Sequence, residues 1–333
     1  MGMRRREFLG VLGGAAVAWP VAARAQQRNA VRHIGVFLGL ATGLEDPGAA
    51  EILRPLRTSM QDAGWTEDKN VRFDVRFGSG DLAKIETAAD ELVALAPEVI
   101  YATGFAPVQA LRQRTRTIPI VFSLVADPVG FGLIESLSRP GGNITGFVVW
   151  DLSIGGKWMQ LLQKVAPDLR RIGIMYNPNT APYAPPLIAS ARASATGGVA
   201  IVECHIRNDS EIEAAAASLG KPQDGGLLVI PEPFTNANRD KIIAQSDRFR
   251  VPTLNPVFGA VDRGALISYT YAFDVMMRQP ANYIDRILRG EPPSNLPVQA
   301  PTKYVLSINL KAAKALGLSV PPMLLGLADQ VIE

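Results

Sequence analysis

Short apolar runs alternate with helical segments along most of the chain. Residues 71–77 (VRFDVRF) alternate apolar with charged side chains, the pattern of a strand with one solvated face. Residues 49–63 place Ile52, Leu56 and Met60 at helical spacing, and Gly64 follows as a helix-ending residue. Further strands are predicted at residues 31–40, 98–102, 118–122, 144–150, 171–176, 199–206, 226–230, 252–255, 265–269 and 304–308. Further helices are predicted at residues 82–95, 107–115, 129–137, 155–165, 186–196, 210–219, 239–249, 273–289 and 310–316.

Strands and helices alternate with this spacing in parallel, doubly wound sheets. The chain begins this order twice, with RHIGVF at residues 32–37 and RIGIMY at residues 171–176. We therefore predict an α/β fold with two doubly wound parallel-sheet lobes joined by a hinge of several strands, as in periplasmic binding proteins of the venus-flytrap type. The first lobe is predicted to hold residues 31–146 and about 271–300, and the second residues 147–270 and about 301–333.

The stretch from residue 118 to residue 150 contains a strand, a turn and a glycine-rich break. Pro128 favours extended geometry at Asp127, which stands between the predicted strand and the predicted helix at residues 129–137. Ligands of open α/β sheets bind outside the carboxyl ends of the strands. Asp127 is therefore either a residue of the ligand mouth or an ordinary helix cap after a strand.

The first 25 residues have the composition of an export signal. Three arginines at residues 4–6 precede an apolar run at residues 10–21, and Ala23-Arg24-Ala25 fits a small-x-small cleavage site. Arg5-Arg6 with Phe8-Leu9 fits the twin-arginine pattern. The apolar run is shorter than the ~20 residues that cross a bilayer. We predict a twin-arginine signal peptide at residues 1–25, cleaved near Ala25, and a periplasmic location.

Charge and composition exclude several classes of function. The chain has 34 basic and 31 acidic residues, but residues 1–25 hold four of the arginines and one acid, which leaves 30 of each sign. A neutral chain gives no support for a nucleic-acid surface. The single cysteine, Cys204, permits no disulfide within the chain, and the two histidines fall in predicted strands. Zinc, haem and iron–sulfur sites need clusters that the sequence lacks. Neither a P-loop nor a Gly-x-Ser-x-Gly elbow with a plausible histidine partner occurs. We predict no cofactor, no metal and no enzyme activity.

Several short motifs resemble a known family. They are IPIVF at residues 118–122, DPVG at 127–130, RPGGNITG at 139–146, GGK at 155–157, YNP at 176–178, PTK at 301–303 and the tail from INLK at 308–311 to ALGL at 315–318. In order and spacing the chain, from about residue 31 to 333, resembles the ABC transporter substrate-binding protein family, which includes members associated with tryptophan or tyrosine uptake. The resemblance implies a fold like that of leucine/isoleucine/valine-binding proteins. One departure is Phe105, where relatives often have a small or polar residue.

The resemblance also implies where a ligand binds. Relatives with this fold hold an amino-acid headgroup with hydroxyls and backbone amides of one lobe and a carboxylate of the other, and helix N-termini can hold the ligand carboxylate. An ammonium group requires an acid, which Asp127 or Glu232 could supply. Turn formation is the alternative role for each of these residues. The predicted ligand-binding residues are Gly39, Thr42, Thr103, Gly104, Phe105, Asp127, Asn177, Asn179, Glu232, Phe234 and Tyr269. Trp150 and Tyr183 are either stacking partners of an aromatic ligand or packing residues.

The function predicted from these features is that of a solute-binding component of an ABC-type importer. We expect a monomer that closes on a small organic solute, an amino acid that could be aromatic or a related carboxylate, and delivers it to a permease in the inner membrane. The alternatives are an exported ligand-sensing partner and a periplasmic oxidoreductase, because the twin-arginine route often carries redox proteins. No nucleic-acid partner is expected.

Overall fold

The computed structural model describes residues 31–221 and 224–333. The predicted signal peptide at residues 1–25 lies outside them. By their internal contacts the described residues form two compact units. Unit 1 holds residues up to Ser123 with Leu133–Gly146 and Arg278–Pro297, and unit 2 holds Leu124–Gly132, Phe147–Met277 and Val298–Glu333. The predicted lobes differ from these units at residues 124–132, 271–277 and about 298–300, which the prediction places in the first lobe.

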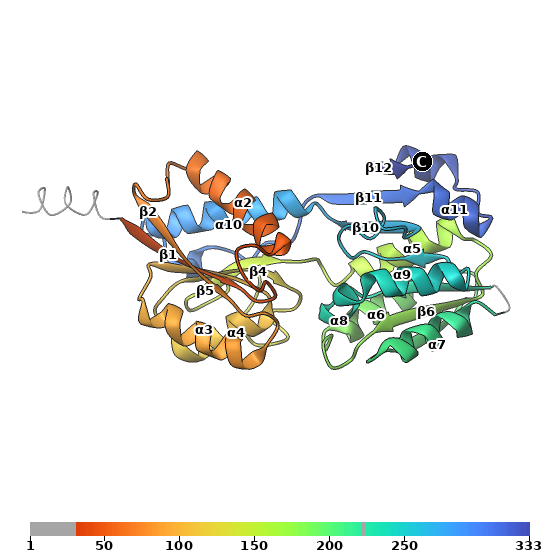
Figure 1. Ribbon diagram of the computed structural model, residues 1–333, viewed down its shortest axis with the longest axis horizontal. Helices are drawn as coiled ribbons and strands as arrows, with labels where there is room; N and C mark the ends of the chain where they lie inside the picture. Colours follow the sequence, from red (N-terminus) through yellow and green to blue (C-terminus); the bar gives the residue numbers. More distant parts are fainter. Residues whose placement is uncertain (1–30, 222–223) are drawn as a thin grey trace, which may run out of the picture. The chain divides into compact units, whose positions relative to one another are not determined.

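Unit 1 is built on a five-stranded sheet in the order β2-β1-β3-β4-β5. Its strands are β1 (Arg32–Leu38), β2 (Val71–Phe77), β3 (Val99–Thr103), β4 (Ile120–Val125) and β5 (Ile144–Val148). Its helices are α2 (Pro47–Asp62), α3 (Leu82–Ala94), α4 (Phe105–Arg114), the end of α10 (Phe273–Leu288) and the 3-10 helix η1 (Pro293–Asn295). In Figure 1, α3 and α4 cover one face of the sheet, and α2 and the end of α10 cover the other. The sheet is doubly wound.

Local sequence explains where these elements begin. The Asp46 carboxylate accepts the Gly48 N–H before α2, and the Asp81 carboxylate accepts the Lys84 N–H before α3, so both acids act as N-caps. Strand β1 is fully buried at Val36, Phe37 and Leu38, whose side chains alternate between the two faces of the sheet, because helices cover both faces.

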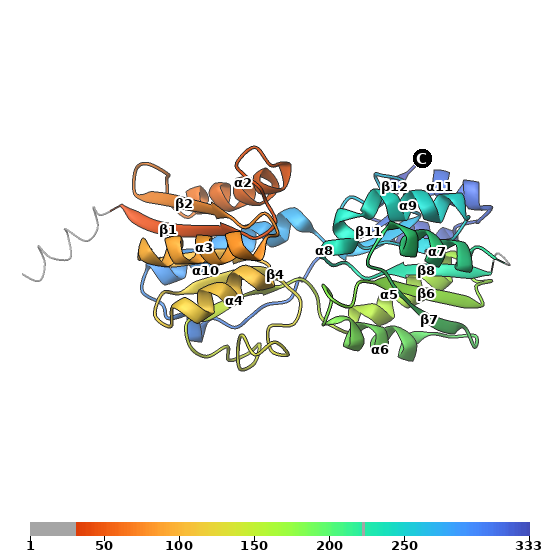
Figure 2. The same cartoon turned by 60° about the horizontal axis from the view of Figure 1, so that its bottom comes forward.

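Unit 2 is built on a seven-stranded sheet in the order β12-β11-β10-β9-β8-β6-β7. Its strands are β6 (Arg171–Tyr176), β7 (Ala200–His205), β8 (Gly225–Val229), β9 (Thr253–Leu254), β10 (Ile267–Tyr271), β11 (Tyr304–Asn309) and β12 (Gln330–Ile332). Its helices are α5 (Ile154–Val165), α6 (Ala184–Ser194), α7 (Asp209–Leu219), α8 (Pro233–Ala237), α9 (Arg239–Arg248), the start of α10, α11 (Leu310–Leu316) and α12 (Pro322–Gly326). A core cluster that includes Ile212 of α7, Val229 of β8 and Ile242 of α9 places α7 and α9 on one face of this sheet. Figure 2 shows α6 and α7 on opposite sides of β6.

The predicted fold of two parallel-sheet α/β lobes is confirmed, with one antiparallel pair in the larger sheet. Strands β6 to β10 pair in parallel, but β11 runs antiparallel to β10. Tyr304, at the start of β11, pairs with Tyr271, at the end of β10. The chain leaves the sheet after Tyr271, passes through α10 and re-enters it at Tyr304, the residue that pairs with Tyr271, so β11 runs back along β10.

One predicted element is wrong. Residues 129–137 form turns and bends where a helix was predicted. The Asp127 carboxylate accepts the Gly130 N–H at 2.8 Å, and Gly132 has a φ of +64°. A side chain that bonds the following backbone, together with two glycines, favours turns over a helix. The short elements α8, α12 and β12 were not predicted at all.

Within residues 31–221 and 224–333, no helix is long and apolar enough to cross a membrane. In the same ranges, no group of three or more His, Cys, Asp or Glu side chains is placed to hold a metal ion.

Candidate functional site

The carboxyl ends of β1 and β3 lie side by side in unit 1, because Leu38 pairs with Thr103. The Gly39 N–H donates to the Thr103 hydroxyl at 3.2 Å. A Cβ at Gly39 would lie 2.8 Å from the Thr103 carbonyl oxygen, so this approach requires glycine. The Gly104 N–H donates to the Ser123 carbonyl at 2.9 Å, which ties β3 to β4. Gly39, Thr103 and Gly104 therefore lie together at one edge of the sheet.

Helix α4 begins at this edge. Gly104 is its N-cap, with a φ of +87° and no side-chain capping bond. Phe105 is its first residue, and 37% of Phe105 is exposed. Backbone N–H groups at a helix N-terminus suit a carboxylate, and in the first turn of α4 they come from Phe105 and Ala106, because the third residue, Pro107, has no N–H. The same edge therefore offers a position for an anionic ligand group.

Thr42 is engaged in a local turn of unit 1. Its N–H and its hydroxyl both donate to the Asp46 carboxylate, at 2.9 and 3.1 Å. The Thr42 N–H is the main cause that lowers the pKa of Asp46, and the Gly48 N–H contributes. Thr42 thus supports the cap of α2.

Asp127, which belongs to unit 2 by its contacts, forms a turn with its own chain. Its carboxylate accepts the Gly130 N–H, and its side chain is partly exposed. Because 129–137 is not a helix, Asp127 is not a helix cap. One hydrogen bond to one oxygen leaves most of the acceptor capacity of the carboxylate available.

Glu232 follows β8 in unit 2 and is 2% exposed. Its carboxylate accepts the Phe234 N–H at 2.7 Å, the Thr235 N–H at 2.8 Å, the Thr180 hydroxyl at 2.5 Å and the Asn177 N–H at 3.4 Å. The Thr235 hydroxyl accepts the Glu232 N–H in return, which makes a capping box at the start of α8. Both carboxylate oxygens of Glu232 therefore already accept hydrogen bonds within unit 2, as expected for a residue that stabilises a turn.

Asn177 follows β6, the strand next to β8, and is 6% exposed. Its side-chain oxygen accepts the Asn179 N–H at 3.0 Å, and Asn179 itself is exposed. This is an Asx turn of the kind that asparagine forms before proline. Asn177, Asn179 and Glu232 thus meet in one hydrogen-bonded turn network.

Two of the three predicted aromatic binding residues, Phe234 and Tyr269, pack within unit 2. Phe234 is partly buried and packs against the core cluster under α7 and α9. The Tyr269 ring stacks on Tyr304 at 5.2 Å, and the Lys157 ammonium lies 5.9 Å from its centroid. Burial, with a smaller effect of Asp329, raises the pKa of Tyr269.

Trp150 and Tyr183 form an aromatic group with Trp158. The Trp150 ring meets Trp158 edge-on at 5.7 Å and Tyr183 at 6.3 Å. The Tyr183 hydroxyl donates to the Pro231 carbonyl at 2.8 Å, and burial raises its pKa. Trp150 is 5% exposed, and its indole N–H has no hydrogen-bond partner within the described part of the chain.

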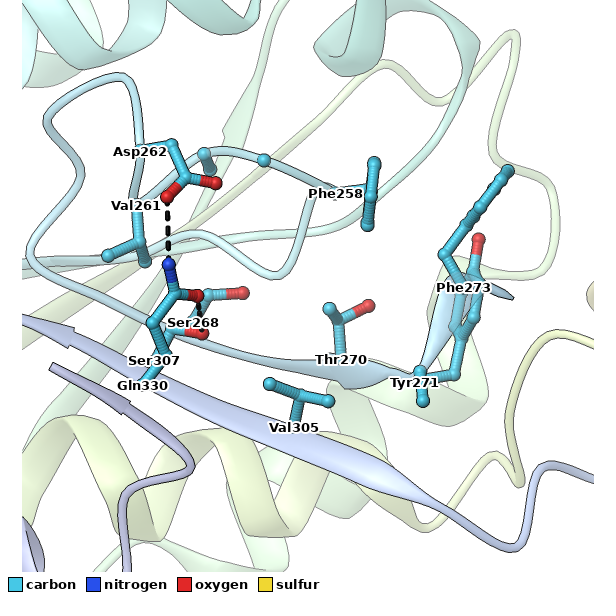
Figure 3. Close-up of a pocket in the computed structure, with 13 residues that line it drawn as sticks. Phe258, Val261, Asp262, Ser268, Thr270, Tyr271, Phe273, Val305, Ser307 and Gln330 are labelled. Carbon is cyan, nitrogen blue, oxygen red and sulfur yellow. Dashed lines mark hydrogen bonds between the residues drawn. The ribbon is translucent and has the colours of Figure 1, made fainter. Parts of the chain in front are cut away.

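A pocket in unit 2 was not predicted from the sequence. It opens between β10, β11 and the loop at residues 258–262, and its cavity volume is about 90 Å³. Figure 3 shows Asp262, Gln330 and Ser307 at one end and Phe258, Tyr271 and Phe273 at the other. The alternation of Ser268 and Thr270 in β10 indicates a polar face, but the sequence does not reveal that the loop covers it.

Solved structures define the class of fold. A conserved domain protein of Vibrio cholerae is 27% identical with a TM-score of 0.80, covering 90% of this chain and 99% of that chain. A Streptococcus pneumoniae ABC domain in complex with L-Trp is 22% identical with a TM-score of 0.80, covering 91% of this chain and 100% of that chain. The fold is that of solute-binding proteins with two α/β units.

The sequence comparison then gives the family. The profile described as "ABC transporter substrate binding protein" matches residues 38–332. The chain belongs to this family, which confirms the resemblance seen in the motifs. A tyrosine-binding protein of Clostridioides difficile (strain R20291) is 25% identical over 280 residues, which are 84% of this chain and 80% of that protein.

Proposed function

We propose that the chain is the solute-binding component of an ABC-type importer and that its solute is an aromatic amino acid. The family match over residues 38–332 carries the transport role. The similar Clostridioides difficile protein is named for tyrosine, and the similar Streptococcus pneumoniae structure contains L-Trp, which supports the choice of solute. The protein acts by binding and delivers the solute to a permease of the inner membrane.

The periplasm is the proposed location. The sequence of residues 1–25 has the order of a twin-arginine signal, and export to the periplasm suits a substrate-binding protein of an ABC importer. We propose that the protein is a monomer in this compartment.

The proposed carboxylate contact is the N-terminus of α4. Gly104, the N-cap residue, makes no side-chain capping bond there and lies beside Gly39 and Thr103. Backbone N–H groups at a helix N-terminus bind a carboxylate without a formal positive charge.

The proposed ammonium contact is Asp127. The predicted alternative, Glu232, already accepts four hydrogen bonds and is buried, whereas Asp127 accepts one and is partly exposed. A charge-assisted hydrogen bond contributes about 1.5–3 kcal/mol. The Asp127→Asn variant should therefore bind the solute about tenfold to a hundredfold more weakly.

A thermal-shift panel tests the function. The purified chain is heated with each of the amino acids, with aromatic acids and with sugars as a negative class. A solute at 100 times its dissociation constant adds about 2.7 kcal/mol to the free energy of unfolding. A shift with tyrosine or tryptophan, reduced in Asp127→Asn and kept in the exposed control Asp168→Asn, supports the proposal. A shift confined to sugars, or no shift with any amino acid, contradicts it.

A further inference from the structure

The pocket between β10, β11 and the loop at residues 258–262 contains a buried hydroxyl without a partner. Ser268 is 4% exposed, and its Oγ atom forms no hydrogen bond in the part of the chain that the structure describes. A buried polar atom without a hydrogen-bond partner destabilises the folded state. Most such groups in folded proteins do have partners, so Ser268 marks a place where a ligand can contribute one.

The polar end of the pocket carries a negative charge. The Ser307 hydroxyl lies 3.0 Å from Gln330 Oε1, and Gln330 Nε2 donates to Asp262 Oδ1 at 2.9 Å (Figure 3). Gln330 is the neutral partner of Asp262, and no Lys, Arg or His among the described pocket-lining residues balances the carboxylate. The pocket therefore suits a cation.

The other polar groups of the pocket indicate which kind of cation fits. Asp262, Ser268, Ser307 and Thr270 provide oxygen acceptors, and a primary ammonium has three N–H donors. A divalent metal ion generally requires several carboxylates or carbonyls, and Asp262 is the one carboxylate among the pocket-lining residues. The arrangement favours a primary ammonium over a metal ion.

The opposite end of the pocket is aromatic. The Phe258 and Phe273 rings lie 4.7 Å apart, and Tyr271 stacks on Phe273 at 6.2 Å. Ser268 and Tyr271 are three strand residues apart, which spans roughly 10 Å. A cavity of about 90 Å³ is smaller than the roughly 150 Å³ that holds one benzene ring. An ammonium head and its adjoining carbons fit inside, and an apolar body lies against the aromatic rim.

We propose that this pocket of unit 2 is a binding site for a primary amine with an apolar or aromatic body, distinct from the amino-acid site. The ammonium contacts Asp262 and Ser268, and the body contacts Phe258 and Phe273. The site needs no ligand carboxylate, because the lining residues offer no cation to pair with it.

Calorimetric titration with 2-phenylethylamine, which lacks a carboxylate, tests the site. The wild-type chain should bind it, Asp262→Asn should lose at least tenfold in affinity, and Ser268→Ala should lose about threefold to tenfold. The exposed control Asp168→Asn should match the wild type. A titration with 3-phenylpropionate, which lacks the ammonium, should give no binding at this site.

Titration of the same variants with L-tyrosine separates this inference from the proposed function. Unchanged tyrosine affinity in Asp262→Asn, together with lost amine affinity, supports a distinct site. Equal losses for tyrosine and amine would overturn it, because the pocket would then belong to the amino-acid site. The proposal is also overturned if the wild type does not bind the amine, or if Asp262→Asn binds it as well as Asp168→Asn does. Absence of both tyrosine and tryptophan binding by the wild type, with amine binding kept, would contradict only the proposed function.

Discussion

Glu232 and Asp262 are two carboxylates of unit 2 with opposite surroundings. Glu232 is buried at the end of β8 and accepts four hydrogen bonds from its own chain. Asp262 is exposed at a pocket and accepts one hydrogen bond from a neutral amide. A carboxylate at a strand end is therefore not by itself a ligand group, and its existing partners decide whether it stabilises the fold or is available to a ligand.

The largest expected effect is that of Glu232→Ala on stability. The substitution removes the cap of α8 and leaves donors of Asn177, Thr180 and Thr235 without a partner. Caps contribute about 1 kcal/mol and charged hydrogen bonds about 1.5–3 kcal/mol, so the free energy of unfolding should fall by about 2–4 kcal/mol. Urea denaturation measures this free energy. The matched control Asp262→Ala should change the free energy of unfolding by less than about 0.5 kcal/mol. Equal losses in the two variants would remove the distinction between the carboxylates.

A second test extends the comparison to the strand edge of unit 1. A Cβ at Gly39 would lie 2.8 Å from both Pro107 Cγ and the Thr103 carbonyl oxygen. Gly39→Ala should therefore destabilise the protein by about 1–3 kcal/mol through overpacking. The matched control is Gly43→Ala, because a Cβ there meets nothing within 4 Å. If the two variants have the same midpoint in thermal unfolding, the edge is not tightly packed.

A third test measures how stability changes at alkaline pH, where the hydroxyls of buried tyrosines lose their protons. Burial raises the pKa of Tyr101 in unit 1 and of Tyr183 in unit 2 above the ordinary value near 10. A raised folded-state pKa means that the folded protein holds these protons more tightly, so stability is full below pH 10 and falls as the pH rises above it. Denaturation between pH 9 and about 11 should show this decline, and Tyr183→Phe should reduce it. An unchanged slope in that variant would show that Tyr183 does not contribute.

The smallest expected effect is that of Ser268→Ala on stability. The substitution breaks no hydrogen bond of the described chain, so the free energy of unfolding should stay the same or rise by up to about 1 kcal/mol. Ser246→Ala is the matched control, since the buried Ser246 hydroxyl donates to the Ile242 carbonyl at 2.8 Å and its loss costs about 1 kcal/mol. A loss in Ser268→Ala as large as the control would mean that Ser268 already has a partner.

Much of the fold could be predicted from the sequence, because hydrophobic spacing reports which faces are buried. The strands at residues 71–77 and 171–176 have the predicted bounds. The helix predicted at residues 129–137 failed because Asp127 bonds the Gly130 N–H, a contact that competes with helix formation and leaves no periodic signal. The short helix α8 begins at a capping box formed by Glu232 and Thr235. From the sequence alone, Glu232 was interpreted as a ligand-binding residue, so this helix was not predicted.

The candidate ligand-binding residues were predicted from their positions at the ends of strands. Whether each is available to a ligand depends on its hydrogen bonds, which strand position does not reveal. Gly39, Thr103 and Gly104 do meet at one sheet edge, because parallel strands end together. The hydrogen bonds from Asn177 and Thr180 to Glu232 and the pocket beside Asp262 could not be predicted, because they join segments far apart in sequence. The ligand-binding role of the eleven candidate residues stays a prediction.

Equilibrium dialysis of the purified chain against labelled L-tyrosine and L-tryptophan tests the central claim most directly. We expect saturable binding of at least one of the two with one site per chain, weakened in Asp127→Asn and kept in Asp168→Asn. Absence of saturable binding of either amino acid to the folded chain would contradict it.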